Sequence, residues 1–156
     1  MNIGTLFSRH ARYRPNHTAL VFEDKRLTHL QLNKEINRLA NALQALGVSK
    51  GDKVATILPN CLELLEVYWA VAKMGAVVVP FSTLLRGKAM ATLLRDSDTG
   101  MVITNASFVE AIDALKPELP GIAHDRYILI DSSNTVGYRG YHALKAAAND
   151  HEPEGI

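Results

Sequence analysis

The sequence predicts an α/β fold, with an open, mainly parallel, doubly wound sheet and a small antiparallel hairpin near the N-terminus. Residues 51–82 read as a complete βαβ unit, strand and helix patterns alternate after it, and two short β-rich runs precede it. Such alternation is typical of a parallel sheet with helices on both faces. With 156 residues, 47% of them hydrophobic, the chain has the size of one domain. We expect this domain over residues 1–148 and a flexible tail over residues 149–156.

The first predicted elements are a short helix and a hairpin. Apolar side chains recur at helical spacing over residues 3–11, and Asn2 or Thr5 is available as the N-cap. Residues 18–22 and 25–28 are β-rich and only two residues apart. This short separation favours an antiparallel hairpin.

A long amphipathic helix follows the hairpin. Thr28 and Gln31 have the spacing of a capping box, in which each side chain bonds the backbone N–H of the other residue. Behind them, apolar residues at helical spacing mark one face, which ends at Gly47: Leu32, Ile36, Leu39, Leu43 and Leu46. The pattern therefore predicts a helix from residue 29 to residue 46.

The central βαβ unit begins with the near-continuous apolar run of residues 53–58, which is typical of a strand covered on both faces. We expect Asn60 to cap the next helix, with Glu63 completing a second capping box, and Gly75 to end that helix. Residues 76–79 then form a second strand, parallel to the first.

The rest of the chain continues the alternation. Its patterns predict a helix over residues 87–97, a strand over 101–104, a helix from Asn105 to Pro117, a strand over 127–130, a polar connection over 131–140 and a helix over 141–148. The acidic tail after residue 148 offers nothing to pack. Four parallel strands leave an apolar edge uncovered, so we expect a homo-oligomer formed through the sheet. A monodisperse monomer in sedimentation would contradict this expectation.

Composition and spacing argue against several kinds of function. The net charge is +1, and the basic residues are scattered without interleaved aromatic side chains, so we expect neither nucleic-acid nor membrane binding. The six histidines lack metal-ligand spacing, and glycine-rich phosphate loops and the G-x-S-x-G motif are absent from the sequence. We expect no metal site, and we assign no catalytic residue to this chain.

Cys61 is the single cysteine. It leaves no partner for an internal disulfide and fits a reducing compartment, and the N-terminus has no signal-peptide pattern, so we expect a cytoplasmic protein. We expect Cys61 in the first turn of the second long helix, where the helix dipole can lower the pKa of a thiol. Because free cysteines are more often small buried hydrophobes, we interpret it as structural.

Three ordered motifs resemble the AMP-forming acyl-CoA synthetases of the adenylate-forming superfamily. They are residues 27–32 (LTHLQL, against L-[TS]-Y-x-E-L), residues 50–60 (KGDKVATILPN, against G-D-x-V-A…L-P-N) and residues 72–80 (AKMGAVVVP, against K-x-G-A-x-x-x-P). His29 and Gln31 depart from the usual Tyr and Glu of the first motif. The resemblance covers about residues 3–131, and we interpret all three motifs as structural.

The resemblance implies that this chain is an incomplete part of the large N-terminal domain of such a ligase. The whole enzyme would use ATP, Mg²⁺ and coenzyme A to activate a carboxylic acid bound by the missing remainder. Its phosphate loop would begin shortly beyond Ile156, and no catalytic residue of the family falls on a position of this chain. We therefore expect the chain alone to be inactive and to bind no cofactor.

Arg86 is the one binding residue that the resemblance indicates. It follows the strand that ends at Pro80, where some relatives place a basic residue near the nucleotide of coenzyme A. Residues 80–86 resemble fatty acid–CoA ligases more than amino-acid-activating enzymes, and aryl acids such as benzoates or coumarates remain an alternative. An independent α/β nucleotide-binding domain and a protein-interaction module are the alternatives from other classes.

Overall fold

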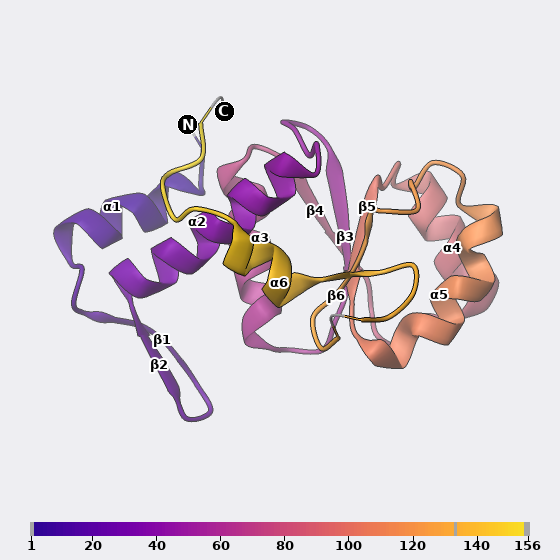
Figure 1. The fold of residues 1–156 in the computed structure, drawn as a ribbon, viewed down its shortest axis with the longest axis horizontal. Helices are drawn as coiled ribbons and strands as arrows, with labels where there is room; N and C mark the ends of the chain where they lie inside the picture. Colours follow the sequence, from indigo (N-terminus) through magenta and orange to yellow (C-terminus); the bar gives the residue numbers. More distant parts are fainter. Residues whose placement is uncertain (1, 133, 155–156) are drawn as a thin grey trace.

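Over residues 2–132 and 134–154, which the computed structural model describes, five parallel strands form one sheet and two antiparallel strands form a separate hairpin (Figure 1). This confirms the predicted fold class. The elements are, in chain order, α1 (Thr5–Tyr13), β1 (Thr18–Phe22), β2 (Lys25–Thr28), α2 (His29–Ala45), β3 (Lys53–Ile57), α3 (Leu62–Lys73), β4 (Val77–Pro80), α4 (Gly87–Asp96), β5 (Met101–Thr104), the 3₁₀ turn η1 (Ala106–Phe108), α5 (Val109–Leu115), the 3₁₀ turn η2 (Lys116–Glu118), β6 (Tyr127–Leu129), β7 (Arg139–Gly140) and α6 (Tyr141–Ala147).

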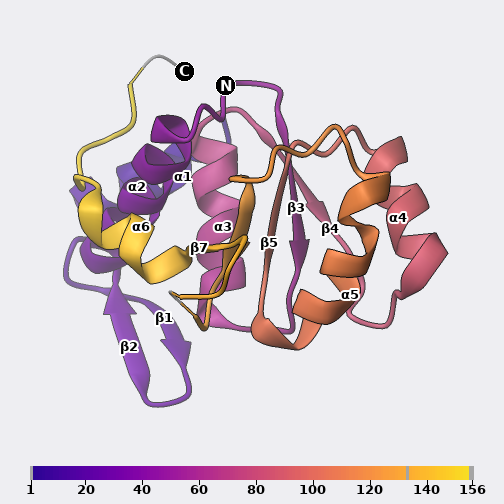
Figure 2. The ribbon, with the colours of Figure 1, turned by 45° about the vertical axis from the view of Figure 1, so that its right-hand side comes forward.

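The sheet has the strand order β4-β3-β5-β6-β7. Helices α4 and α5 cover one face of the sheet, and helices α2, α3 and α6 lie on the side of the opposite face (Figure 2). The sheet is therefore doubly wound, as predicted. Strand β7 corrects the expectation that residues 131–140 are only a polar connection, because Arg139 and Gly140 pair with β6. A strand of two residues carries no periodicity that a sequence pattern could show.

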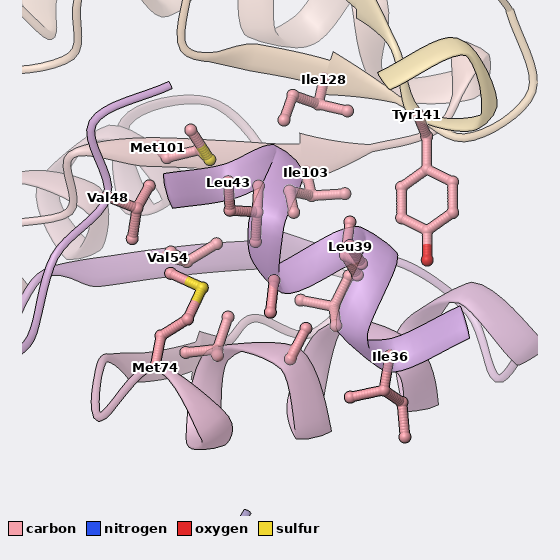
Figure 3. Close-up of a cluster of buried hydrophobic side chains, with 14 of the residues drawn as sticks. Ile36, Leu39, Leu43, Val48, Val54, Met74, Met101, Ile103, Ile128 and Tyr141 are labelled. Carbon is pink, nitrogen blue, oxygen red and sulfur yellow. The ribbon is translucent and has the colours of Figure 1, made fainter. Parts of the chain in front are cut away.

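Two apolar layers account for the near-continuous hydrophobic runs of the central strands. Val54 packs against α2 and α3, and the next residue, Ala55, packs against α4 and α5. Successive strand residues point to opposite faces of the sheet. A strand that is covered on both faces therefore needs apolar residues at consecutive positions, not only at every second one. Figure 3 shows the α2 side, where Leu39 and Leu43 lie beside the strand residues Met101 and Ile103.

The predicted capping box at the start of α2 is confirmed. The Gln31 N–H donates to Thr28 Oγ1 at 3.2 Å, and the Thr28 N–H donates to Gln31 Oε1 at 2.9 Å. The second predicted box is wrong, because the N-cap of α3 is Cys61 and makes no side-chain capping bond. Cys61 keeps an extended backbone, with φ −152° and ψ 169°. The first helical residue is therefore Leu62, and the N-cap position falls on Cys61 instead of Asn60.

Two other predicted N-caps also change. The N-cap of α1 is Gly4, and Asn2 contributes by accepting the Gly4 N–H at 2.8 Å. Asn105 begins a 3₁₀ turn, and its side chain accepts the Ser107 hydroxyl instead of a backbone N–H. In both places a short polar side chain bonds locally and shifts the start of the helix.

Residues 149–154 pack along α2, which contradicts the expectation that nothing in the tail packs. Asn41 Nδ2 donates to the carbonyls of Asn149 and His151, each at 3.0 Å, and Gln44 Nε2 donates to the Glu154 carbonyl at 3.1 Å. The amides of α2 thus bond the tail backbone. A hydrophobicity pattern cannot indicate such docking. Residues 155–156 lie outside the described part of the chain.

Within residues 2–132 and 134–154, no helix combines the length and apolarity that a bilayer crossing requires.

The contact between Gly4 and α3 gives the first prediction. A Cβ atom at Gly4 would lie 2.5 Å from both the Cα and the backbone N of Lys73, although the Gly4 φ of −60° suits any residue. We expect Gly4→Ala to lower the free energy of unfolding by about 1–3 kcal/mol, because the backbone must move to admit the methyl group. Urea denaturation measures the change.

The matched control for this steric effect is Gly100→Ala. A Cβ atom there meets no heavy atom within 4 Å, and Gly100 is not among the glycines with positive φ. We expect a change within about 0.5 kcal/mol. If Gly4→Ala and Gly100→Ala lowered the free energy of unfolding equally, α1 would not pack closely on α3.

Candidate functional site

The carboxyl ends of the strands form the candidate site, because open parallel sheets bind ligands there, at the point where the strand order reverses. Here the chain passes from β3 outward to β4 and then returns across β3 to β5. Thr104 Oγ1 donates to the Ile57 carbonyl at 2.9 Å and ties β5 to β3 at this point. We call the loops that follow these strands the carboxyl edge: residues 58–61, 81–86, 105–108 and 130–132.

The structure places Arg86 at the carboxyl edge, in the loop between β4 and α4. Its Nη1 donates to the carbonyls of Thr83 and Leu85, at 2.6 and 2.7 Å. Its guanidinium carbon lies 4.9 Å from the ring centroid of Phe108, within the range of a cation–π contact. Arg86 is exposed. The loop after β4 and the loop after β5 therefore hold this guanidinium in place at the surface.

Asp131 joins the two neighbouring loops of the carboxyl edge. Its carboxylate oxygens accept the Ala106 N–H at 2.9 and 3.1 Å, so the end of β6 is bonded to the start of η1. A hollow of about 360 Å³ beside it is lined by Ile130, Asp131, Ser132, Gly140, His142 and Ala143. The bond from the Ala106 N–H thus gives Asp131 a structural role, because it connects two loops of the carboxyl edge.

Cys61 lies at the start of α3, beside the hairpin. It borders an apolar hollow of about 260 Å³, whose other lining residues are Leu20, Phe22, Asn60, Leu62, Leu64, Leu65 and Tyr68. Burial is the main cause of the shift and raises the pKa of the Cys61 thiol. The thiol is therefore not an activated nucleophile, which agrees with its interpretation as a small apolar side chain.

A buried ammonium lies at the end of α3. Lys73 is 3% exposed, and its Nζ lies 2.6 Å from Asn37 Oδ1, 2.7 Å from Asn33 Oδ1, 2.7 Å from Glu152 Oε2 and 2.9 Å from Ser8 Oγ. Burial lowers the pKa of Lys73, and Glu152 opposes that effect. Four oxygen acceptors around one nitrogen favour the charged form at neutral pH. This group, the Lys73 cluster, joins α1, α2, α3 and the tail.

The other half of the Lys73 cluster is a carboxylate. Burial alone would raise the pKa of Glu152, but hydrogen bonds from Asn33, Lys73 and Ser8 outweigh it and lower the pKa to about 2. The Glu152 side chain is 52% exposed, so the pair borders solvent on one side. This arrangement positions the tail, and its groups face one another instead of an open pocket.

A second buried network joins α6 to α3. Glu66 Oε2 accepts from the Tyr141 hydroxyl and from Lys145 Nζ, and Lys145 also pairs with Glu35 at 2.7 Å. Burial lowers the pKa of Lys145, but the two carboxylates outweigh that effect and raise it. Burial and then Glu66 raise the pKa of Tyr141 well above its ordinary value. A phenol and an ammonium whose pKa values are both raised, each bonded to Glu66, indicate a structural network.

Among the described residues, no arrangement fits Mg²⁺ or a glycine-rich cradle for the phosphates of ATP. Within residues 2–132 and 134–154, no three His, Cys, Asp or Glu side chains gather in a metal-binding arrangement. Gly51, Gly87, Gly100 and Gly121 stand singly with open space around them and form no phosphate-binding turn. We therefore derive no chemical step through Mg²⁺ or ATP on this chain.

Sequence reasoning missed the Lys73 cluster. One signal was available, because Asn33 and Asn37 are four residues apart on the same helical face as the apolar residue Ile36. Two amides among apolar positions indicate a buried polar partner. The identity of that partner could not be inferred, since Lys73 and Glu152 lie far away in the sequence.

Comparison with known proteins identifies a family. The sequence profile described as "AMP-binding enzyme" matches residues 7–154. The long-chain-fatty-acid–CoA ligase FadD13 of Mycobacterium tuberculosis is 38% identical over 128 residues, which cover 80% of this chain and 25% of that protein. The crotonobetaine/carnitine–CoA ligase of Salmonella paratyphi A is 40% identical over 96 residues, which cover 58% of this chain and 19% of that protein.

The fold has a counterpart among solved structures. The crystal structure of the anthranilate CoA ligase AuaEII, in complex with anthranoyl-AMP, aligns with a TM-score of 0.89 and 26% identity over 97% of this chain and 29% of that one. The chain spans a quarter or less of the length of both curated relatives.

The burial of Lys73 gives the second prediction. We expect Lys73→Met to lower the free energy of unfolding by about 2–4 kcal/mol, because two buried amide oxygens lose their donor. Chemical denaturation of the whole chain measures the loss. The control is Lys34→Met, since Lys34 also pairs with the tail, at 3.3 Å from Asp150, but is 51% exposed. We expect that control to change by less than about 1 kcal/mol.

Glu152 gives the third prediction, on pH. Its folded pKa of about 2 lies below the ordinary 4.5, so its contribution to stability is present above pH 4.5 and is lost as the pH falls toward 2. We expect Glu152→Gln to be less stable than the wild type at about pH 6, and the two to converge near about pH 2–3. Urea denaturation at several pH values measures both. A stability difference independent of pH would contradict the assignment of a charged pair.

Proposed function

Because this chain belongs to the AMP-binding enzyme family, we propose that it is the N-terminal part of an ATP-dependent fatty acid–CoA ligase. The observation that carries the proposal is the family match over residues 7–154. In the proposed reaction, the carboxylate of the acid attacks the α-phosphorus of ATP, giving an acyl-adenylate and pyrophosphate. The thiol of coenzyme A then attacks the acyl carbon, giving the thioester, AMP and a proton.

A fatty acid is the substrate class that we favour. Support comes from the relative named long-chain-fatty-acid–CoA ligase, which is 38% identical over 80% of this chain. An aryl acid is the second candidate, because the anthranilate CoA ligase aligns with a TM-score of 0.89. A pocket for either acid would be formed mainly by the remainder of the enzyme, so the described residues favour neither candidate.

This chain would supply a scaffold to the proposed enzyme. The three motifs shared with the family have structural explanations here, since the first caps α2 and the other two bracket the β3-α3-β4 unit. In the third motif, Lys73 joins four segments. The chain presents no catalytic carboxylate, base or phosphate loop among its described residues, so we propose that it is inactive alone.

Pyrophosphate release tests the proposed function and gives the fourth prediction. With ATP, Mg²⁺, coenzyme A and either palmitate or benzoate, we expect no turnover from residues 1–156 and palmitate-dependent release from the full-length ligase. Benzoate-dependent release would select the aryl alternative. Turnover by residues 1–156 alone would overturn the assignment of a scaffold. If neither protein turned over and calorimetry found only ATP or AMP binding, an independent nucleotide-binding domain would replace the proposal.

We also propose that Arg86 binds coenzyme A in the complete enzyme. Its guanidinium is exposed at the carboxyl edge, and Phe108 and two carbonyls hold it in place. A guanidinium held in this way can bind a phosphate group of the nucleotide through two parallel hydrogen bonds. Its Nε and Nη2 make no hydrogen bond within residues 2–132 and 134–154, which leaves these atoms for a ligand.

The fifth prediction concerns this arginine. In the full-length ligase, we expect Arg86→Ala to raise the KM for coenzyme A about tenfold, as the loss of a charge-assisted hydrogen bond of about 1.5 kcal/mol implies, with the KM for ATP unchanged. Lys88→Ala is the control, because Lys88 is exposed two residues away and lies in α4. An unchanged KM for coenzyme A in Arg86→Ala would remove Arg86 from the site.

A further inference from the structure

Two histidine rings meet where α1 lies beside the start of α2. The imidazoles of His10, in α1, and His29, the first residue of α2, stack with ring centroids 5.0 Å apart and planes inclined by 22°. The turn between α1 and β1 is bonded to the same point. The His29 N–H donates to the His17 carbonyl at 3.0 Å, and the Leu30 N–H donates to the Pro15 carbonyl at 3.1 Å. We call this contact the histidine junction: residues 10, 14–17, 29 and 30.

The charged groups around His29 are all basic. His10, His17 and Arg14 act on it electrostatically. In Figure 1, α1, the hairpin and the start of α2 lie together at one end of the molecule. Residues 2–22 contain neither Asp nor Glu, strand β2 is KRLT, and the first turn of α2 has no acidic residue. His29 also begins a helix of 17 residues, where the helix dipole disfavours a positive charge. All of these neighbours therefore oppose protonation of the His29 ring.

The hydrogen bonding of His29 opposes its protonation as well. Its Nδ1 is buried and has no hydrogen-bond partner within residues 2–132 and 134–154. A neutral imidazole leaves one ring nitrogen without a proton, whereas an imidazolium carries a proton on both nitrogens. A charged His29 would therefore bury an N–H group without an acceptor. Burial first, and then His10, His17 and Arg14, lower the pKa of His29 below its ordinary value of 6.5.

Metal binding is the other use that two neighbouring imidazoles suggest, and their stacking disfavours it. The lone pair of an imidazole nitrogen lies in the plane of its ring, so two rings stacked face to face do not direct their lone pairs at one point. Among residues 2–132 and 134–154, no three His, Cys, Asp or Glu side chains are placed to hold a metal ion. The pair is therefore better suited to respond to protons than to bind a metal.

We propose that the histidine junction is a pH-sensitive hinge, which holds the turn between α1 and β1 against the start of α2 at neutral pH and releases it in acid. Protonation of His29 places a cation beside basic groups, and separation of the turn from the helix lets water solvate that charge. The lowered pKa gives the sign: the junction is fully stabilised above about pH 6.5 and weakens as the pH falls below that value. The first half of α1 stays attached, because Phe7 packs on Trp69 and Ser8 bonds Lys73.

Amide hydrogen exchange of residues 1–156, followed by NMR, tests the hinge independently of the proposed ligase function. The amides of His29 and Leu30 report on it, because both donate to the turn. Between about pH 7.5 and about pH 5.5, we expect their protection factors to fall about three- to tenfold after correction for intrinsic exchange, since one pKa unit corresponds to a factor of ten. The Val102 amide, which donates to the Arg126 carbonyl inside the sheet, should keep its protection. Titration of the His29 ring in the same samples should give a pKa below 6.5.

Two variants and a matched control assign the effect to His29. His29→Tyr keeps an aromatic ring for the stack and gains no proton in this pH range, so we expect the protection of its Leu30 amide to change less than about twofold. Arg14→Gln removes one neighbouring cation, so we expect it to raise the pKa of His29 and to reduce the loss of protection. The control is His124→Gln, because His124 is exposed in the loop before β6. We expect this control to lose protection at the junction as the wild type does.

Four results would overturn the proposal. The first two concern the wild type: equal protection of the His29 and Leu30 amides at both pH values, or a pKa of His29 at or above 6.5. The third is a loss in folded His29→Tyr as large as in the wild type, which would show that another group drives the opening. The fourth is an equal loss at the Val102 amide, which would show that acid destabilises the whole fold instead of a local hinge. Should His29→Tyr fail to fold, the wild-type titration and Arg14→Gln still decide the question.

Discussion

The buried ammonium of Lys73 is the constraint on which the arrangement of this chain depends. A charge removed from water costs several kcal/mol unless oxygen atoms surround it. Here α1, α2 and the tail each supply such atoms, from Ser8, from Asn33 and Asn37, and from Glu152. Apolar packing also brings these elements together, since the Phe7 ring lies on Trp69 and α2 shares a core with Val67 of α3. Both ends of the described chain therefore converge on one nitrogen atom.

Helix α3 is held by polar groups near both of its ends and by apolar packing between them. Lys73 is its last residue, whereas Glu66, about two turns earlier, binds Tyr141 and Lys145 of α6. Between them, Val67, Ala70 and Val71 are fully buried beside β3. Since α3 connects β3 to β4, this double attachment also fixes the strands whose carboxyl ends carry the candidate site.

The sequence was sufficient to predict the features that depend on neighbouring residues. The capping box of Thr28 and Gln31, the apolar strands and the doubly wound sheet are all local patterns or follow from their order. Features set by distant or very short segments escaped prediction. Strand β7 has two residues, the start of α3 moved by one residue to Cys61, and the tail docks through amides of α2. For the site, the sequence placed Arg86 beyond β4, but its contact with Phe108 required the fold.

The distance in sequence between Lys73 and Glu152 has a consequence for how the protein is made. The two residues are 79 positions apart, so a ribosome adding about 5–20 residues per second needs about 4–16 s to pass from one to the other. During that interval the nascent sheet can already form, while the lysine lacks its carboxylate. Until Glu152 has been made, Lys73 has only Ser8, Asn33 and Asn37 as acceptors, so the fourth bond of the cluster forms after the other three partners are in place.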